Sequence, residues 1–487
     1  MTELDLDDIQ GFVLRRYPMP VSRNILLAVG DPAAARAALG RLVNGDETDA
    51  LQVSSAASPP AQDMPYRLYV GITWTGLVAL EVPDRLPGVS FRSFPSFVAG
   101  APARAEGLGD RGPSAPDQWI PGFRNNEGHV FVSLYAPSRP QLEAHSTCLD
   151  AILAGDNAFR ELWCGDGEAL IEKDERGEPV YVRKAHFGYR DAITEPTIKG
   201  GPGPYPPESQ EPCDPWLFVL MDEAPNYYVP DPPELGRNGS FGVFRVEEQD
   251  VVGFENFLQS QKDRIDPELL AAKLMGRWRN GVPLAVSPDT DCPPDGMPPE
   301  KLNNFDYVYA DGSGDYWGER TPIGAHIRRV NPRGQPIKGQ SIPGGSNNDH
   351  RIVRRALPYG PTYDPSEPYD GIERGLIGFF INSRIDNQFE FVLREWLNSA
   401  DAVGSVRLDP HSNDVIAGAN DSSESVFEIP QPHGAPPIRI TDFRSFTHTR
   451  ATAYCFLPSI TALRCIAGPT DAGDQSVGEA RPNGQIA

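Results

Sequence analysis

The strongest constraint on the fold of this chain is an alternation of strand-like and helix-like segments that occurs in both halves. Short apolar runs typical of strands are followed by segments whose apolar residues recur at helical spacing. The strand-like runs are 24–29, 66–72, 129–135, 240–246 and 376–381, and the helix-like segments are 31–43, 75–80, 141–153, 250–260 and 387–397. The pattern predicts an α+β chain with a duplicated split β-α-β layout, in which antiparallel sheets are covered by helices.

The bulk properties of the chain argue against several classes of partner. With 487 residues, the chain is long enough for two sizeable domains. Its net charge of −23 at pH 7 would repel nucleic acid and anionic membrane surfaces. It contains no long apolar run that would span a membrane, and its acidic N-terminus lacks the pattern of an export signal. We therefore expect a cytoplasmic protein that binds neither nucleic acid nor membranes.

Proline-rich segments suggest where the chain divides. The stretch 199–235 contains KGGPGPYPPESQEPCDP and YYVPDPPE, a composition typical of a connection. We therefore predict an N-terminal domain over 1–198, a connection over 199–235 and a C-terminal domain over 236–467. The remaining segment, 468–487, is rich in Gly, Asp and Ser with few apolar residues, which predicts a flexible tail.

A histidine followed by arginines is the first candidate site. In TPIGAHIRRVNPR, His326 lies in an apolar, strand-like run, and Arg328, Arg329 and Arg333 follow it. A neutral imidazole beside arginines suits a metal centre whose attached groups are anionic. Haem is such a centre, because its iron takes an axial histidine and its propionates pair with arginines. The alternative is a core histidine beside a solvated basic strip.

Two further segments carry an acidic and a basic candidate. HFGYRDAITEP contains Asp191, and RRALPYG begins with Arg354. A carboxylate close to a metal can take and return a proton, and a fixed positive charge stabilises an anion. Taken alone, Asp191 would also fit a turn or a helix N-cap, and Arg354 would fit the surface of a strand.

Together, HFGYRDAITEP, GAHIRRVNPR and RRALPYG resemble, in this order, the signature segments of the DyP-type (dye-decolourising) haem peroxidases. Weaker similarities, among them DIQGFVLRRY, GRNGSFGVFR and FLPSITALR, extend the resemblance from Asp8 to Arg464. It implies two ferredoxin-like domains, with one haem b held mainly by the C-terminal one. It also implies a peroxidase that reduces hydrogen peroxide and oxidises small aromatic donors, either phenolic or dye-like.

The resemblance assigns roles to individual residues. Asp191, in the segment that matches the family's G-x-x-D-G motif, would move a proton during peroxide cleavage. Arg354 would stabilise negative charge on the peroxide. His326 would be the proximal ligand of the haem iron.

Residues around His326 receive supporting roles. Asp414 in NDVIAG is the candidate for the carboxylate that accepts a hydrogen bond from His326, and Glu390 is the alternative. Arg328, two residues beyond His326 on the expected strand, would share its face and pair with a propionate. Leu376, in the segment RGLIGFF, would contact the haem.

Three positions depart from the family's pattern. Ala192 replaces the second glycine of the motif, and Ala356 stands where glycine or asparagine is common. Gly378 stands where we expect a bulky side chain over the haem, which predicts a more open distal pocket. These departures leave an alternative function, namely a haem carrier or a haem-free binding or structural member of the family.

Overall fold

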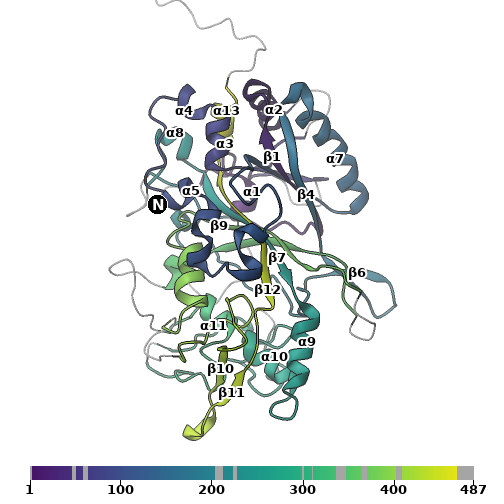
Figure 1. Ribbon diagram of the computed structural model, residues 1–487, viewed down its shortest axis with the longest axis vertical. Helices are drawn as coiled ribbons and strands as arrows, with labels where there is room; N and C mark the ends of the chain where they lie inside the picture. The colour runs from purple at the N-terminus through teal and green to yellow at the C-terminus, as the bar shows by residue number, and fades with distance from the viewer. Residues whose placement is uncertain are drawn as a thin grey trace, which may run out of the picture.

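The computed structural model describes residues 3–45, 51–58, 64–202, 212–222, 228–298, 301–309, 311–335, 347–364, 370–401 and 408–468. The main strands are β1 (Val21–Val29), β2 (Arg67–Ile72), β3 (Val130–Ala136), β4 (Phe159–Glu168), β7 (Ser240–Gln249), β8 (Val353–Tyr359), β9 (Gly375–Asn382) and β12 (Thr447–Leu457). They form one sheet in the order β4-β1-β3-β2-β12-β7-β9-β8 (Figure 1). Two small hairpins pair β5 (Leu170–Lys173) with β6 (Pro179–Val182) and β10 (Val426–Ile429) with β11 (Ile438–Thr441).

Every strand pair in these sheets is antiparallel, and the α+β prediction is confirmed. The N-terminal strands occupy one side of the large sheet and the C-terminal strands the other, and they meet where Phe456 pairs with Ile72. The predicted connection separates the two groups of strands, because β6 ends before 199 and β7 begins after 235. Its bounds stay a prediction, and the predicted tail beyond 468 lies outside the described residues.

Helices flank the sheet in both halves (Figure 1). They are α1 (Gly11–Leu14), α2 (Pro32–Asn44), α3 (Trp74–Ala79), α4 (Val82–Arg85), α5 (Pro95–Ala99), α6 (Ala101–Arg104), α7 (Arg139–Leu153), α8 (Pro233–Gly236), α9 (Val251–Ser260), α10 (Pro267–Met275), α11 (His326–Val330), α12 (Phe389–Phe391) and α13 (Ile460–Ala467). Helix α2 begins after an Asp31 cap, whose carboxylate accepts a hydrogen bond from the backbone N–H of Ala34 at 2.8 Å.

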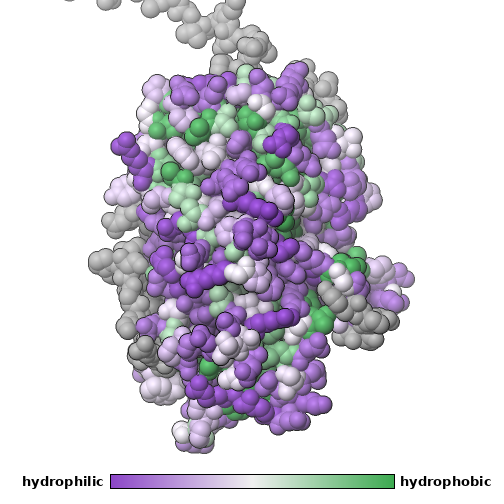
Figure 2. Space-filling view, in the orientation of Figure 1, coloured by the Kyte–Doolittle hydropathy of each residue, from purple (hydrophilic) through white to green (hydrophobic). Residues whose placement is uncertain are grey.

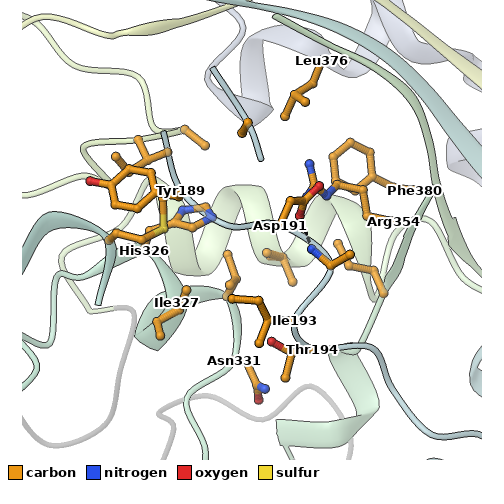
Figure 3. A pocket seen from close by; sticks show the side chains of 18 of the residues that line it. Tyr189, Asp191, Ile193, Thr194, His326, Ile327, Asn331, Arg354, Leu376 and Phe380 are labelled. Carbon is orange, nitrogen blue, oxygen red and sulfur yellow. Dashed lines mark hydrogen bonds and ion pairs between the residues drawn. The ribbon is translucent and has the colours of Figure 1, made fainter. Parts of the chain in front are cut away.

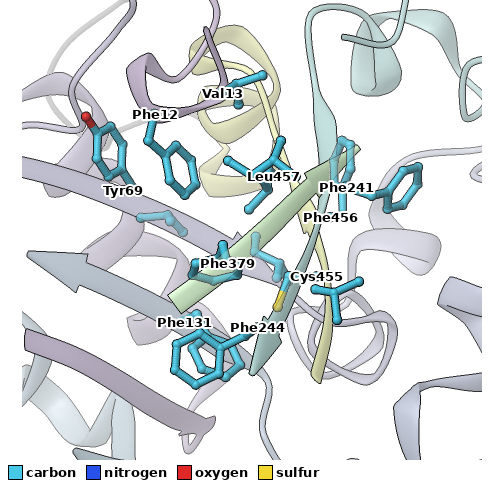
Figure 4. Packing of buried hydrophobic residues seen from close by; sticks show 14 of the residues in the cluster. Phe12, Val13, Tyr69, Phe131, Phe241, Phe244, Phe379, Cys455, Phe456 and Leu457 are labelled. Carbon is cyan, nitrogen blue, oxygen red and sulfur yellow. The ribbon is translucent and has the colours of Figure 1, made fainter. Parts of the chain in front are cut away.

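One aromatic core joins the two halves of the sheet. Phe131 of β3 lies 4.6 Å from Phe244 of β7, measured between ring centroids, and Phe244 lies 5.1 Å from Phe379 of β9 (Figure 4). All three rings are buried. Side chains from both halves interdigitate here, so a shared core holds the two halves of the sheet together.

The large sheet is curved so that its two edge strands come close together. A Cβ added to Gly167 of β4 would lie 2.9 Å from the Cβ of Leu357 in β8 and 3.0 Å from Ile377 in β9. The absence of a side chain at Gly167 therefore permits this approach.

Polar residues cover most of the face shown in Figure 2, in agreement with the high net charge. Within the described ranges, the search for a helix long and apolar enough to cross a membrane finds none.

The segment around His326 is a helix, α11, and the strand predicted there is wrong. The prediction rested on the alternation of Ile323, Ala325 and Ile327, a pattern too short to separate a strand from a buried helix. On a helix, two residues two positions apart point in directions about 200° different. Arg328 therefore cannot share a face with His326.

Candidate active site

A cavity of about 360 Å³ contains the histidine, the aspartate and the arginine that the sequence singles out. His326 comes from α11, Asp191 from the segment between β6 and β7, and Arg354 from β8. Figure 3 shows His326 toward one side of this cavity and the Asp191–Arg354 pair toward the other. The volume falls within the range of roughly 300–1,000 Å³ that is typical of ligand and cofactor sites.

His326 is held by a buried carboxylate. Its Nδ1 lies 3.1 Å from both carboxylate oxygens of Asp414, which is fully buried. Oδ1 of Asp414 also accepts hydrogen bonds from the backbone N–H groups of Ile416 and Ala417, at 2.9 and 2.7 Å. An Nδ1–H that donates to Asp414 leaves the lone pair on Nε2 of His326, which is the arrangement of a metal-ligating histidine.

The charge of Asp414 is favoured by its surroundings. Burial by itself raises the pKa of Asp414, but His326, the positive charge of Arg329 and the N–H of Ala417 outweigh it. The pKa of this carboxyl group therefore lies below its ordinary value. The alternative partner, Glu390, lies elsewhere, because it accepts hydrogen bonds from Ser96, Arg104 and Tyr454.

Asp191 and Arg354 form an ion pair in the cavity wall. The carboxylate of Asp191 also accepts a hydrogen bond from the backbone N–H of Ala192 at 2.7 Å. Burial raises the pKa of Asp191, but the charges of Arg354 and Arg16 and the Ala192 N–H outweigh this effect and leave the pKa below its ordinary value. Asp191 therefore stays ionised in mildly acidic solution and can accept a proton there.

Ala192 occupies a backbone conformation that glycine adopts more easily. Its φ of 56° lies in the left-handed region, which costs an L-residue roughly 1–2 kcal/mol. The chain thus keeps the turn that directs the Ala192 N–H toward Asp191, although it lacks the family's glycine.

Arg328 does not line the cavity, so the prediction that it pairs with a propionate is wrong. It is fully buried, and its guanidinium donates to the carbonyl oxygen of Thr321 at 2.6 Å and to the carboxylate of Asp315 at 3.0 Å. The helical geometry of α11 turns Arg328 away from His326 and into this loop. Arg328 therefore stabilises the segment that leads into α11.

Four other arginines that line the cavity are buried: Arg245, Arg277, Arg333 and Arg351. The guanidinium of Arg333 donates to the carbonyl oxygens of Asn303 and Phe305, at 2.6 and 3.1 Å. Sequence reasoning noted Arg333 but missed Arg351, although RIVRR places an arginine three positions before Arg354. Guanidinium groups at a cavity wall suit an anionic group such as a carboxylate.

The apolar wall comes from β9 and from a wide π-type helical turn, Val392–Leu397. Leu376 of β9, which the sequence predicts to contact the haem, lines the cavity together with Phe380. The π-type turn contributes Val392, Leu393 and Leu397. Apolar walls, an available imidazole and nearby guanidinium groups match the ring, the iron and the propionates of a haem.

The prediction of an empty space at Gly378 is wrong. A Cβ at this position would lie 2.1 Å from the carbonyl oxygen of Arg355 and 2.5 Å from Cα of Ala356. Gly378 therefore permits the close approach of β9 to β8 and leaves no gap over the cavity. A bulky side chain of β9 that does line the cavity is Phe380.

The second acid that follows the motif, Glu195, is held by two arginines. It pairs with Arg16 at 2.9 Å and with Arg355 at 3.0 Å. Glu195 lines the cavity as well, but neither of its ion pairs includes Asp191 or Arg354.

Comparison with known proteins gives a consistent set of relatives, although no family model matches the chain. A dye-decolorizing peroxidase from Mycena epipterygia is 27% identical, over 95% of this chain and 87% of the relative. A second relative, the multifunctional dye peroxidase DyP2 of Amycolatopsis, is 28% identical over 81% of both chains.

Solved structures agree with these relatives. The structure of an ancestral D-type dye decolorizing peroxidase is 26% identical, with a TM-score of 0.76 over 95% of this chain and 99% of that one. A dye-decolorizing peroxidase in complex with 2,6-dimethoxyphenol is 25% identical, with a TM-score of 0.77 over 96% of this chain and all of that chain. Because both kinds of likeness extend over nearly the whole chain, this protein is a peroxidase that is similar in sequence and in fold to the DyP-type haem peroxidases.

Proposed function

We propose that Asp191 and Arg354 carry out the peroxide chemistry of this enzyme, beside a haem b that His326 holds, and that the electron donors are phenols and dye-like aromatic molecules. The observation that carries the proposal is the Asp191–Arg354 ion pair in the same cavity as the His326–Asp414 pair. One pair offers a base and a fixed positive charge, and the other offers an imidazole nitrogen.

Haem, when bound, supplies the electron transfer that reduces the peroxide. His326 would bind the iron through Nε2, and Asp414 would keep that nitrogen electron-rich by accepting the Nδ1–H at 3.1 Å. Arg333 and Arg351 line the cavity and suit the propionates.

Asp191 is the proton carrier in this proposal. The ionised carboxylate takes a proton from one oxygen of hydrogen peroxide and returns it to the other oxygen, which leaves as water. Its lowered pKa keeps it ionised at acidic pH. The proposal therefore implies that activity persists into acidic solution.

Arg354 has two tasks. Its ion pair holds the carboxylate of Asp191 in the cavity wall. Its positive charge stabilises the negative charge that develops on the peroxide oxygens once the proton is removed.

The donor class rests on the chemistry of the reaction and on the relatives. Reduction of one peroxide to two waters consumes two electrons and two protons, which two phenol molecules supply by losing one of each. One of the similar structures is a complex with 2,6-dimethoxyphenol, and several relatives are named for dyes.

A haem carrier is the alternative function, and the Asp191–Arg354 ion pair argues against it. Transport of haem requires an axial ligand and an apolar cavity, but it does not require an ionised carboxylate paired with an arginine.

Mixing the haem-loaded protein with hydrogen peroxide and 2,6-dimethoxyphenol tests the proposal. We expect coloured oxidation product in proportion to peroxide consumed, and much slower product formation in the haem-loaded Asp191→Asn variant. A protein that binds haem stoichiometrically but forms no product with peroxide would instead be a carrier.

A further inference from the structure

A second cavity, of about 380 Å³, lies beside β8. Arg355, Ala356 and Leu357 line it, whereas Arg354 lines the haem cavity. Arg354 and Arg355 are neighbours on β8 and point to opposite faces of the strand, and Arg16 lines both cavities, so the second cavity adjoins the haem cavity. The remaining walls come from residues 12–20, from β2 and β3, and from residues 181–183.

The charge in this second cavity has one sign. Of the described residues that line it, five are arginines and none is acidic; the arginines are Arg15, Arg16, Arg67, Arg183 and Arg355. We call it the arginine pocket. Such a concentration of positive charge is unexpected in a protein with a net charge of −23. Its field favours a negatively charged ligand.

Arg355 is deeply buried, with 6% of its surface exposed, which makes its charge costly unless enough negative charge lies nearby. Arg355 shares the single carboxylate of Glu195 with Arg16, at 3.0 and 2.9 Å. Burial lowers the pKa of Arg355, and the positive charge of Arg16 lowers it further. One carboxylate therefore serves two guanidinium groups.

Aromatic rings also line the pocket. Arg67 lies over the ring of Tyr17 at 4.3 Å from its centroid, and Tyr69 and Tyr135 line the same cavity. Tyr69 is 2% exposed, and its hydroxyl has no hydrogen-bond partner in the structure as described. Figure 4 shows this hydroxyl directed away from the phenylalanine core, on which the Tyr69 ring stacks through Phe12.

Buried hydroxyl groups of tyrosine normally have a partner. Burial raises the pKa of Tyr69 and of Tyr135, the latter to about 12, so both hydroxyls stay protonated and can donate to an anion. The arginine pocket thus combines guanidinium groups, hydroxyl donors and flat aromatic surfaces.

We propose that the arginine pocket is a second ligand site, which binds a small aromatic carboxylate. Its carboxylate would pair with guanidinium groups, and its ring would lie against the tyrosines, as planar guanidinium and aromatic groups favour. The Tyr69 hydroxyl would gain the partner that it lacks. The site does not require a bound haem, so it stands or falls independently of the peroxidase roles given above.

Calorimetric titration with 1-naphthoate tests this site, and its neutral counterpart 1-naphthamide is the matched control ligand. The haem-loaded protein is first saturated with cyanide, so that the haem cavity is closed to the probe. We expect one naphthoate per chain, with naphthamide bound at least about tenfold more weakly because it lacks the charge. Equal affinity for the two probes would overturn the proposal.

Variants locate the bound probe. Arg15→Gln and Arg183→Gln, at the pocket, should each weaken naphthoate binding several-fold. Arg92→Gln removes the same charge from an exposed residue outside both cavities and should leave binding unchanged. Loss of binding in Arg92→Gln to the same extent would show a non-specific charge effect and would contradict the assignment.

Tyr69→Phe gives an independent readout. Because the hydroxyl has no hydrogen-bond partner among the described residues, its removal should weaken naphthoate binding without lowering the melting temperature. A fall in melting temperature with unchanged binding would make Tyr69 a structural residue and overturn its role. Naphthoate binding that occurs only without cyanide would place the probe in the haem cavity and overturn the second site.

Discussion

Arg354 of β8 and Asp191 of the segment between β6 and β7 form an ion pair in the wall of the haem cavity. The two residues are far apart in sequence. Their ion pair joins the segment that contains Asp191 to strand β8, in the C-terminal half of the sheet. The same contact sets both the position and the charge of Asp191, since Arg354 contributes to its lowered pKa.

Replacement of Asp191 by asparagine removes the proton acceptor but keeps the size of the side chain. We expect the peroxide-dependent change of the haem spectrum to slow by about 10²–10⁴-fold, the usual contribution of general acid–base catalysis. Haem content should stay the same, because Asp191 does not hold the haem in this account. Stopped-flow spectroscopy measures the rate, with Glu195→Gln as the control for loss of a nearby carboxylate.

Wild-type rates in Asp191→Asn together with slow rates in Glu195→Gln would reassign the proton transfer to Glu195.

Replacement of Arg354 by leucine should change the pH dependence as well as the rate. The charge of Arg354 lowers the pKa of Asp191, whereas burial raises it, so the pKa should rise when Arg354 is removed. Asp191 acts as a base only when it is ionised. As the solution is acidified, activity should therefore fall at a higher pH in Arg354→Leu than in the wild type. Profiles of kcat/KM against pH test this. If kcat/KM of Arg354→Leu fell at the same acidic pH as that of the wild type, the loss of activity in acid would not come from protonation of Asp191.

The sequence sufficed for the main residues of the site because their motifs are local. HFGYRDAITEP, GAHIRRVNPR and RRALPYG identify Asp191, His326 and Arg354, and all three lie in one cavity. Asp414 was identified by resemblance, and its contact with His326 exists only in the folded chain. No local pattern reports such a long-range contact.

Two predictions, one about Arg328 and one about Gly378, were wrong because they depended on backbone geometry that the sequence pattern does not determine. Three alternating apolar residues suggested a strand at α11, and the face assigned to Arg328 followed from that. Likewise, the close contact between Gly378 and the carbonyl oxygen of Arg355 depends on strand pairing, which sequence alone did not supply.

Replacement of Ala192 by glycine should stabilise the protein slightly. Relief of the left-handed strain is worth about 1–2 kcal/mol, and the added entropy of the unfolded chain takes back about 0.4–1 kcal/mol. The free energy of unfolding, measured with urea, should therefore rise by up to about 1.6 kcal/mol. Ala356→Gly is the matched control, because a glycine within β8 should lower stability instead. Destabilisation in both variants would argue against strain at Ala192.

Replacement of Gly378 by alanine should destabilise the fold without closing the cavity. The new Cβ would meet the carbonyl oxygen of Arg355 at 2.1 Å, and overpacking of this kind costs roughly 1–3 kcal/mol. Gly107→Ala, at a position with nothing within 4 Å of the added Cβ, is the control and should be nearly neutral. Urea unfolding gives both values, and equal stability of the two variants would contradict the close strand contact.

The most direct test of the whole account is the absorption spectrum of the haem-loaded protein and of its His326→Ala variant. We expect the wild type to bind one haem per chain with an intense Soret band, and His326→Ala to lose that band or to bind haem weakly. His145→Ala, on α7 and outside the cavity, should keep the wild-type spectrum. An unchanged Soret band in His326→Ala would show that another residue binds the iron and would contradict the central assignment.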